Sequence, residues 1–228
     1  MNVEVFADPE TLADAAADWI AKVLLDAHGE RVSLGLSGGS TPGATYQRLR
    51  GMPAAWERVD AWLADERWVP HNHADSNGLM AEELLLSHVD ATFYRPRWAP
   101  WLEPEESAAH YEAVLRSIHP TAGPDLVLLG IGTDGHTASL FPGTASLSIE
   151  RRWYVANEVP HLDTWRLTAS IPFLHRAQKV CFLVAGAEKA EALAAVAAGE
   201  DLPATLVANG VSDTTWLIDR AAAANLST

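Results

Sequence analysis

Short apolar runs alternate with amphipathic segments along the chain, and this alternation predicts its secondary structure. The runs at 125–130 and 179–185 are continuously apolar at their centres, as in parallel strands that are buried on both faces. Further strands are predicted at 31–36, 59–64, 153–157, 165–170 and 214–218.

Apolar residues at helical spacing fill the segments between these strands. The first helix begins at Pro9, which Asp8 can cap, and ends before Gly29. Further helices are predicted over about 42–50, 78–87, 105–118 and 187–198, and the proline-rich segment 95–104 is predicted to be a connector. Because strands alternate with helices and no linker interrupts them, we expect one α/β domain over residues 1–228 with a mainly parallel sheet flanked by helices.

Composition narrows the possible partners. The 228 residues are 48% hydrophobic and 20% charged, which are globular values, and the net charge is −14. This charge argues against a nucleic-acid partner and against anionic membranes, whereas a few local cations can still bind a small anion. The single cysteine, Cys181, lies in an apolar run and is interpreted as core. The N-terminus lacks a basic and apolar leader and no apolar stretch could span a membrane, so a cytoplasmic location is expected.

Three polar clusters follow predicted strands, after Leu36, Ala64 and Leu129. In a parallel sheet, ligands bind beyond the carboxyl ends of the strands, so these clusters mark the candidate site. The first cluster joins a strand to a helix, and its glycines, hydroxyls and free N–H groups can form a phosphate cradle or an ordinary tight connection. It consists of Ser37, Gly38, Gly39, Ser40 and Thr41, followed by Pro42.

Two other motifs overlap these clusters. Residues 35–39 match the G-x-S-x-G nucleophile elbow of serine hydrolases, although too few strands precede the serine for that fold. Residues 130–135 match the G-x-G-x-x-G pattern of dinucleotide-binding proteins, but Pro142 and Gly143 interrupt the helix that this motif requires. Both interpretations are less favoured than a phosphate cradle and a catalytic histidine.

The third cluster contains Asp134 and His136. A histidine at a strand end, with a carboxylate two residues earlier, suits general base catalysis on water. The alternative is a histidine that only caps the following turn. We favour the catalytic role because this histidine lies in a glycine-lined strand exit.

The remaining candidates are cations and a histidine-containing loop. Asp65, Glu66 and Arg67 form a charged strand end that could equally be a solvated turn. Arg166 lies on a predicted strand, and Lys189 lies in the first turn of a helix, where it opposes the helix dipole. A metal site could use His71, His73 and Asp75, but a solvated loop is preferred and no metal is expected.

Taken in order, these motifs resemble the 6-phosphogluconolactonase family over residues 5–220. The resemblance rests on the segments 36–42, 65–70 with 76–77, 130–142, 166–168 and 184–189. The related glucosamine-6-phosphate deaminases share the glycine loop and the Asp134-Gly135-His136 motif. They typically have D-E-Y in place of 65–67 and I-A-F-N-E-P in place of 137–142, so this sequence is similar to the lactonases at both points.

The resemblance implies a modified Rossmann-like sheet, no cofactor, and hydrolysis of 6-phospho-D-glucono-1,5-lactone to 6-phospho-D-gluconate in the oxidative pentose phosphate pathway. The alternatives are a phosphosugar deaminase or isomerase and a non-catalytic phosphosugar-binding protein. The sequence does not fix the oligomeric state, although a monomer is favoured.

The resemblance also implies roles for the candidate residues. His136 is expected to be the base and Asp134 to orient it, with Arg67 serving the oxyanion or a hydroxyl and Asp65 contacting sugar hydroxyls. The phosphate would be held by the glycine loop with Arg166 and Lys189. All of this requires that His136 and the turn at 38–39 line the same cleft.

Overall fold

The computed structural model describes residues 1–119 and 121–226. The main sheet contains β1 (Asn2–Phe6), β2 (Val32–Leu36), β3 (Val59–Leu63), β5 (Thr92–Tyr94), β6 (Leu126–Leu129), β9 (Lys179–Val184) and β10 (Thr214–Asp219). The helices are α1 (Pro9–Asp26), α2 (Ser40–Leu49), α3 (Asn77–Leu84), α4 (Pro104–Ile118), α5 (Ile171–Leu174), α6 (Ala190–Ala197) and α7 (Pro203–Gly210). None of the described helices is both long and apolar enough to cross a membrane.

The seven strands are parallel and follow the order β1-β10-β9-β6-β2-β3-β5. From β2, the chain builds outward through β3 and β5 on one side and through β6, β9 and β10 on the other. The strand order therefore reverses between β2 and β6, and the loops after these two strands diverge at their carboxyl ends. A crevice at this position is the usual ligand site of open α/β sheets.

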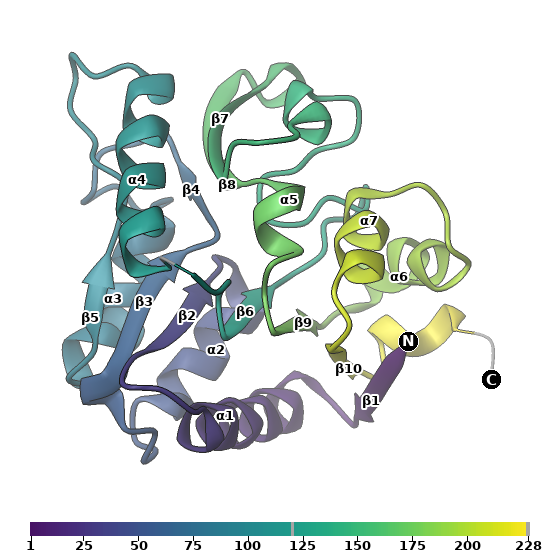
Figure 1. The fold of residues 1–228 in the computed structure, drawn as a ribbon. Helices are drawn as coiled ribbons and strands as arrows, with labels where there is room; N and C mark the ends of the chain where they lie inside the picture. Colours follow the sequence, from purple (N-terminus) through teal and green to yellow (C-terminus); the bar gives the residue numbers. More distant parts are fainter. Residues whose placement is uncertain (120, 227–228) are drawn as a thin grey trace.

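Helices cover both faces of the main sheet, as the apolar runs predict. On one face α1, α2 and α3 pack on side chains such as Leu34, Leu128 and Cys181. On the other, α4 to α7 pack on alternate residues such as Val127 and Phe182. Figure 1 shows α1 along the lower side of the molecule and α4 upright at its left. The α/β class and the buried position of Cys181 are thus confirmed.

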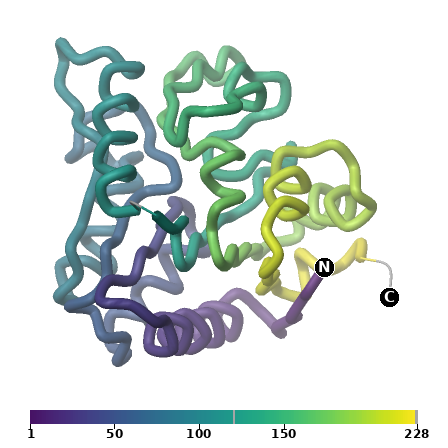
Figure 2. Tube along the Cα trace, in the orientation of Figure 1, coloured from purple at the N-terminus to yellow at the C-terminus, as the bar shows by residue number. Residues whose placement is uncertain are grey.

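A second, antiparallel sheet stands on the carboxyl side of the first. It consists of β4 (Asp65–Arg67), β8 (Thr164–Ala169) and β7 (Tyr154–Val159), in that order. The hairpin formed by β7 and β8 rises beside α4 (Figure 2), and β7 packs on that helix. The alternative of a solvated turn at 65–67 is therefore wrong, because these residues pair with β8 about a hundred positions later.

The element boundaries agree with the sequence prediction in part. The capped start of α1 is confirmed, since Asp8 accepts a hydrogen bond from the Thr11 N–H at 2.8 Å. Helix α2 begins at Ser40, two residues before Pro42, which therefore occupies its third position. The predicted helix at 187–198 starts with a 3₁₀ turn over Ala187–Lys189. Strands β1, β4 and β5 and helices α5 and α7 were not predicted.

Candidate active site

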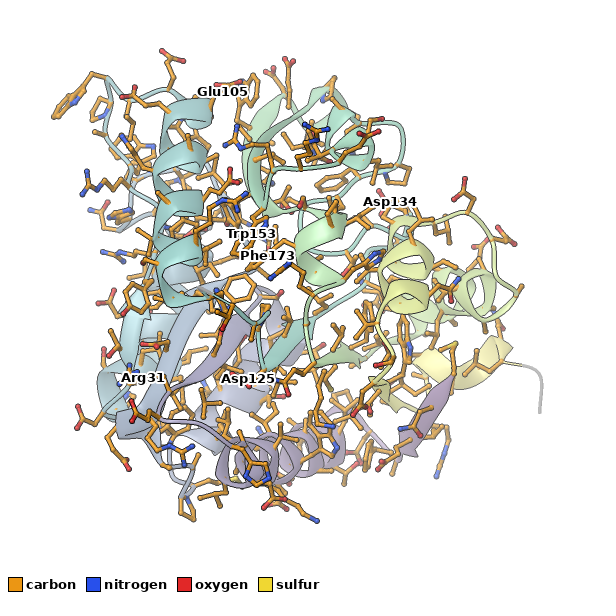
Figure 3. The ribbon with its side chains drawn as sticks, viewed as in Figure 1. Arg31, Glu105, Asp125, Asp134, Trp153 and Phe173 are labelled. Carbon is orange, nitrogen blue, oxygen red and sulfur yellow. The ribbon has the colours of Figure 1, made fainter. Side chains whose placement is uncertain are left out.

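A cavity of about 230 Å³ opens at the carboxyl edge of the main sheet, beside the reversal between β2 and β6. Figure 3 shows Asp134 at this upper edge, whereas Arg31 and Asp125, which precede β2 and β6, lie at the lower edge. The cavity is lined by Ser37, Gly38, Gly39, Asp65, Arg67, Asn77, Gly130, Ile131, Gly132, His136, Ala138 and Lys189. The histidine and the turn at 38–39 therefore line the same cavity, as the hypothesis requires.

The glycine loop presents backbone N–H groups at the start of α2. Gly39 has φ 113°, a left-handed value that favours glycine, and it directs the chain into the helix. Among the described residues, none accepts a hydrogen bond from the N–H groups of Ser40 or Thr41, and the helix dipole makes this end attractive to an anion. Ser40 and Thr41 are not among the residues that line the cavity, so their contribution is to the charge of its wall.

The side chain of Ser37 is buried and hydrogen-bonded within the protein. Its hydroxyl donates to the Leu128 carbonyl at 2.8 Å, and its N–H donates to the Tyr46 hydroxyl at 3.1 Å. This geometry contradicts a nucleophile elbow, because the hydroxyl points to a backbone carbonyl instead of a base. Ser37 shapes the cavity floor, and the free N–H donors of the loop are those of the following residues.

His136 and Asp134 form a hydrogen-bonded pair at the cavity wall. The Nδ1 atom of His136 lies 2.5 Å from Oδ1 of Asp134, and the Gly132 N–H donates to the His136 carbonyl at 2.8 Å. A Cβ at position 132 would overlap the His136 ring, so only glycine allows this approach. Partial burial opposes ionisation of Asp134, but the charge and N–H groups of His136 hold the pKa of Asp134 below its ordinary value.

Phe141 packs against the His136 ring. The two ring centroids are 4.2 Å apart with planes tilted by 31°, and Phe141 is buried. The carboxylate and the phenyl ring together hold the imidazole in one orientation. Because Asp134 accepts the Nδ1–H, Nε2 is the ring nitrogen that can accept a proton.

Asp65 joins three separate segments at the cavity floor. Its carboxylate accepts hydrogen bonds from Ser139 Oγ at 2.7 Å and from Asn77 Nδ2 at 3.1 Å. Glu66, next to it, is buried and points to the start of α3, where it accepts bonds from the N–H groups of Asn77 and Gly78 at 2.7 and 2.8 Å. Burial raises the pKa of Glu66, although its donors oppose the shift. Both carboxylates therefore fix the framework of the site.

Three cations gather at the same edge. Arg67 and Lys189 line the cavity, and Arg166 lies directly opposite Arg67 in the β4–β8 ladder without lining it. Arg67 is held by a bond from Nη1 to the Asp75 carbonyl at 2.7 Å. Burial and the neighbouring charge of Arg67 lower the pKa of Arg166. On a chain of charge −14, this concentration of positive charge suits an anionic ligand.

Comparison with known proteins agrees with these features. Residues 7–216 match the family of glucosamine-6-phosphate isomerases and 6-phosphogluconolactonase. The chain belongs to this family. It is 37% identical to a 6-phosphogluconolactonase of Nostoc sp., over 99% of this chain and 98% of that protein, and 36% identical to one of Synechocystis sp. over the same shares.

Solved structures of the family have the same fold. A 6-phosphogluconolactonase from Trypanosoma brucei superposes with a TM-score of 0.85 at 27% identity, covering 99% of this chain and 98% of that chain. A monomeric glucosamine-6-phosphate deaminase gives 0.84 at 25% identity, covering 99% and 100%. Fold alone therefore does not separate the two activities within the family.

The other sequence interpretations find little support in this geometry. The segment 130–143 contains turns and no helix, so the helix that a dinucleotide would need after Gly135 is missing. In the loop where a metal was the less favoured alternative, His71 bonds the Pro96 carbonyl, while His73 accepts the Asp75 N–H. Within residues 1–119 and 121–226, no three His, Cys, Asp or Glu side chains are grouped to hold a metal.

Several residues of the site framework are not marked by the sequence pattern. Ser139 donates to Asp65, its N–H bonds Thr168 Oγ1 at 3.2 Å, and its carbonyl accepts from Asn157 Nδ2 at 2.9 Å. Ser139 and Thr168 lie in the segments 130–142 and 166–168, on which the family resemblance rests. That position could have identified them as candidates. Asn157 lies on an ordinary-looking strand, and nothing in the local pattern marks it.

Proposed function

We propose that this protein hydrolyses 6-phospho-D-glucono-1,5-lactone to 6-phospho-D-gluconate, a step of the oxidative pentose phosphate pathway. The proposal rests on the pairing of His136 with Asp134 at the wall of the cavity. The glycine loop and Lys189 line the same cavity. One side offers a base for water, and the other offers groups that bind an anion.

In the proposed mechanism, Nε2 of His136 takes a proton from water as its oxygen attacks the lactone carbonyl carbon. Asp134 fixes the tautomer and stabilises the imidazolium that forms. The tetrahedral intermediate collapses with cleavage of the bond between the carbonyl carbon and the ring oxygen. The proton on His136 then passes to the departing ring oxygen, and the new carboxylic acid ionises.

Arg67 is the candidate for the oxyanion of the intermediate or for a substrate hydroxyl, since its guanidinium lines the cavity. The phosphate is assigned to the glycine loop, the N-terminus of α2 and Lys189, with Arg166 adding charge from beside Arg67. Asp65 is assigned to sugar hydroxyls through lone pairs left free by Asn77 and Ser139. Binding of the far end would hold the carbonyl near His136.

The second candidate is a phosphosugar deaminase, which the similarity to the monomeric deaminase structure favours. The lactonase is preferred because the segments 65–67 and 137–142 have the lactonase form, and because the higher identities are to lactonases. We further expect the enzyme to act in the cytoplasm as a monomer without a cofactor.

The deciding experiment measures proton release on freshly prepared 6-phosphogluconolactone, corrected for spontaneous hydrolysis. We expect saturable turnover of the lactone and no ammonia from glucosamine 6-phosphate. Ammonia release without lactonase activity would assign the deaminase instead. Saturable binding of both compounds without turnover of either would indicate a non-catalytic binding protein.

A further inference from the structure

A second concave surface lies on the connector 95–103, between β5 and α4. Two hollows of about 300 and 140 Å³ meet there, and they share Arg97 and His110. We call this surface the connector groove; its principal lining residues are His71, Arg95, Arg97, Trp98, Trp101 and His110. None of these residues lines the active-site cavity, and the larger hollow has the size of a small-molecule pocket.

The groove exposes an aromatic surface that folding does not require. Trp101 is 83% exposed, the most open of the large apolar side chains of the described residues. Isolated exposed apolar residues are common, but here a second indole, Trp98, lines the same hollow. Indole faces bind flat, unsaturated rings by stacking.

The charge of the groove is opposite to that of the molecule. The net charge is −14, yet no Asp or Glu is among the described residues that line either hollow. Arg95 is paired with Glu82 at 3.0 Å. No described carboxylate pairs with the guanidinium of Arg97, which is therefore available to an anionic ligand.

The backbone that carries these side chains is fixed. The Ser107 hydroxyl donates to the Arg97 carbonyl at 2.5 Å, and His71 Nε2 bonds the Pro96 carbonyl at 2.9 Å. Trp98 packs on Trp68 with centroids 6.4 Å apart. The connector lacks regular secondary structure but is anchored on both sides, so the groove is formed before a ligand arrives.

We propose that the connector groove binds a nucleoside phosphate, with the base against Trp101 and Trp98 and the phosphate at Arg97. A nucleoside monophosphate combines the two chemistries that the groove offers, a flat aromatic ring and an anion. The other candidate, an acidic peptide, would use the charge but does not require the two indoles of the hollow.

The test is isothermal titration calorimetry of the full-length protein with AMP, adenosine and ribose 5-phosphate. We expect AMP to bind at least tenfold more tightly than adenosine, which lacks the phosphate, or ribose 5-phosphate, which lacks the base. Trp101→Ala and Arg97→Ala should each weaken AMP binding about tenfold, and Trp101→Phe should retain most of it. Arg50→Ala, a surface arginine outside the groove, is the matched control and should bind AMP as the wild type does.

Circular dichroism and lactone hydrolysis without nucleotide report whether the variants are folded, and neither should change. Absence of AMP binding at millimolar concentration would overturn the proposal. Equal affinity for ribose 5-phosphate and AMP would do the same, as would a polyglutamate peptide that binds where AMP does not. Because AMP binding is measured without turnover, its failure is distinct from a failure of the proposed lactonase activity.

Discussion

Replacing Asp134 by Asn tests how the base is organised, because it removes one charge and keeps the shape of the side chain. The carboxylate accepts the Nδ1–H of His136 at 2.5 Å, and it accepts the backbone N–H of the same residue at 3.2 Å. An Asn amide can turn its NH₂ group toward Nδ1 and so stabilise the tautomer that carries its proton on Nε2. That tautomer cannot accept a proton from water.

The size of the effect follows from the exposure of the pair. The side chain of His136 is 29% exposed and that of Asp134 is 40% exposed, so solvent screens their attraction. An ion pair of this kind contributes at most about 1 kcal/mol. Adding the loss of the correct tautomer, we expect kcat to fall by about 10–10²-fold. His136→Ala removes the base itself and should cost about 10²–10⁴-fold.

The assay is proton release from the fresh lactone, with both variants and the double variant measured in parallel. If Asp134 acts only through His136, adding Asp134→Asn to His136→Ala lowers kcat no further. Asp163→Asn is the control, since it removes an exposed charge at a left-handed position that Asn tolerates. Near-wild-type turnover of His136→Ala would refute the mechanism, and additive effects in the double variant would refute the assigned role of Asp134.

Three further substitutions test the phosphate site, the framework of the active site and a buried histidine of the core. Lys189→Ala should raise KM with little change in kcat; a lower kcat at constant KM would place the lysine on the transition state. Ser139→Ala removes a buried bond to Asp65 and should lower Tm by about 5 °C in calorimetry; an unchanged Tm would contradict this. Burial lowers the pKa of His119, whose Nε2 bonds Ser33 Oγ at 2.6 Å, so unfolding should bind a proton and stability in urea should fall as the pH drops below 6.5. His119→Gln should reduce that slope by at most about 1.4 kcal/mol per pH unit, and an identical slope would exclude this histidine as the cause.

A strand of the main sheet could be predicted from the sequence only where it is buried. Strands β6 and β9 are covered on both faces and read as continuous apolar runs, so their local pattern identifies them. Strand β1 is an edge strand without a fully buried residue, and β5 has only three residues, so neither has a distinctive pattern. Helix α2 starts two residues before the predicted position, because Pro42 is compatible with the whole first turn and occupies its third position instead of its first.

Strands β7 and β8 of the second sheet were predicted, but the pairing of β4 with β8 could not be, because it is not local. Arg67 and Arg166 are direct neighbours across the β4–β8 ladder although 99 positions separate them, and each strand shows only a weak pattern. Electrostatics works against placing two arginines opposite each other, and burial of Arg166 adds to the cost. Such a local conflict is typical of a site that receives an anion.

The part of the candidate site that lies directly after the strands could be predicted from the sequence. Parallel strands β2, β3 and β6 are adjacent, so the loops after them had to meet, and they bring Gly39, Asp65 and His136 to one cavity. What holds the loop of His136 in place comes instead from the second sheet, through the bonds of Ser139 to Asp65 and Thr168. The orientation of the base therefore depends on contacts between segments far apart in the sequence. A substitution at Thr168 or Ser139 should alter catalysis without touching the substrate.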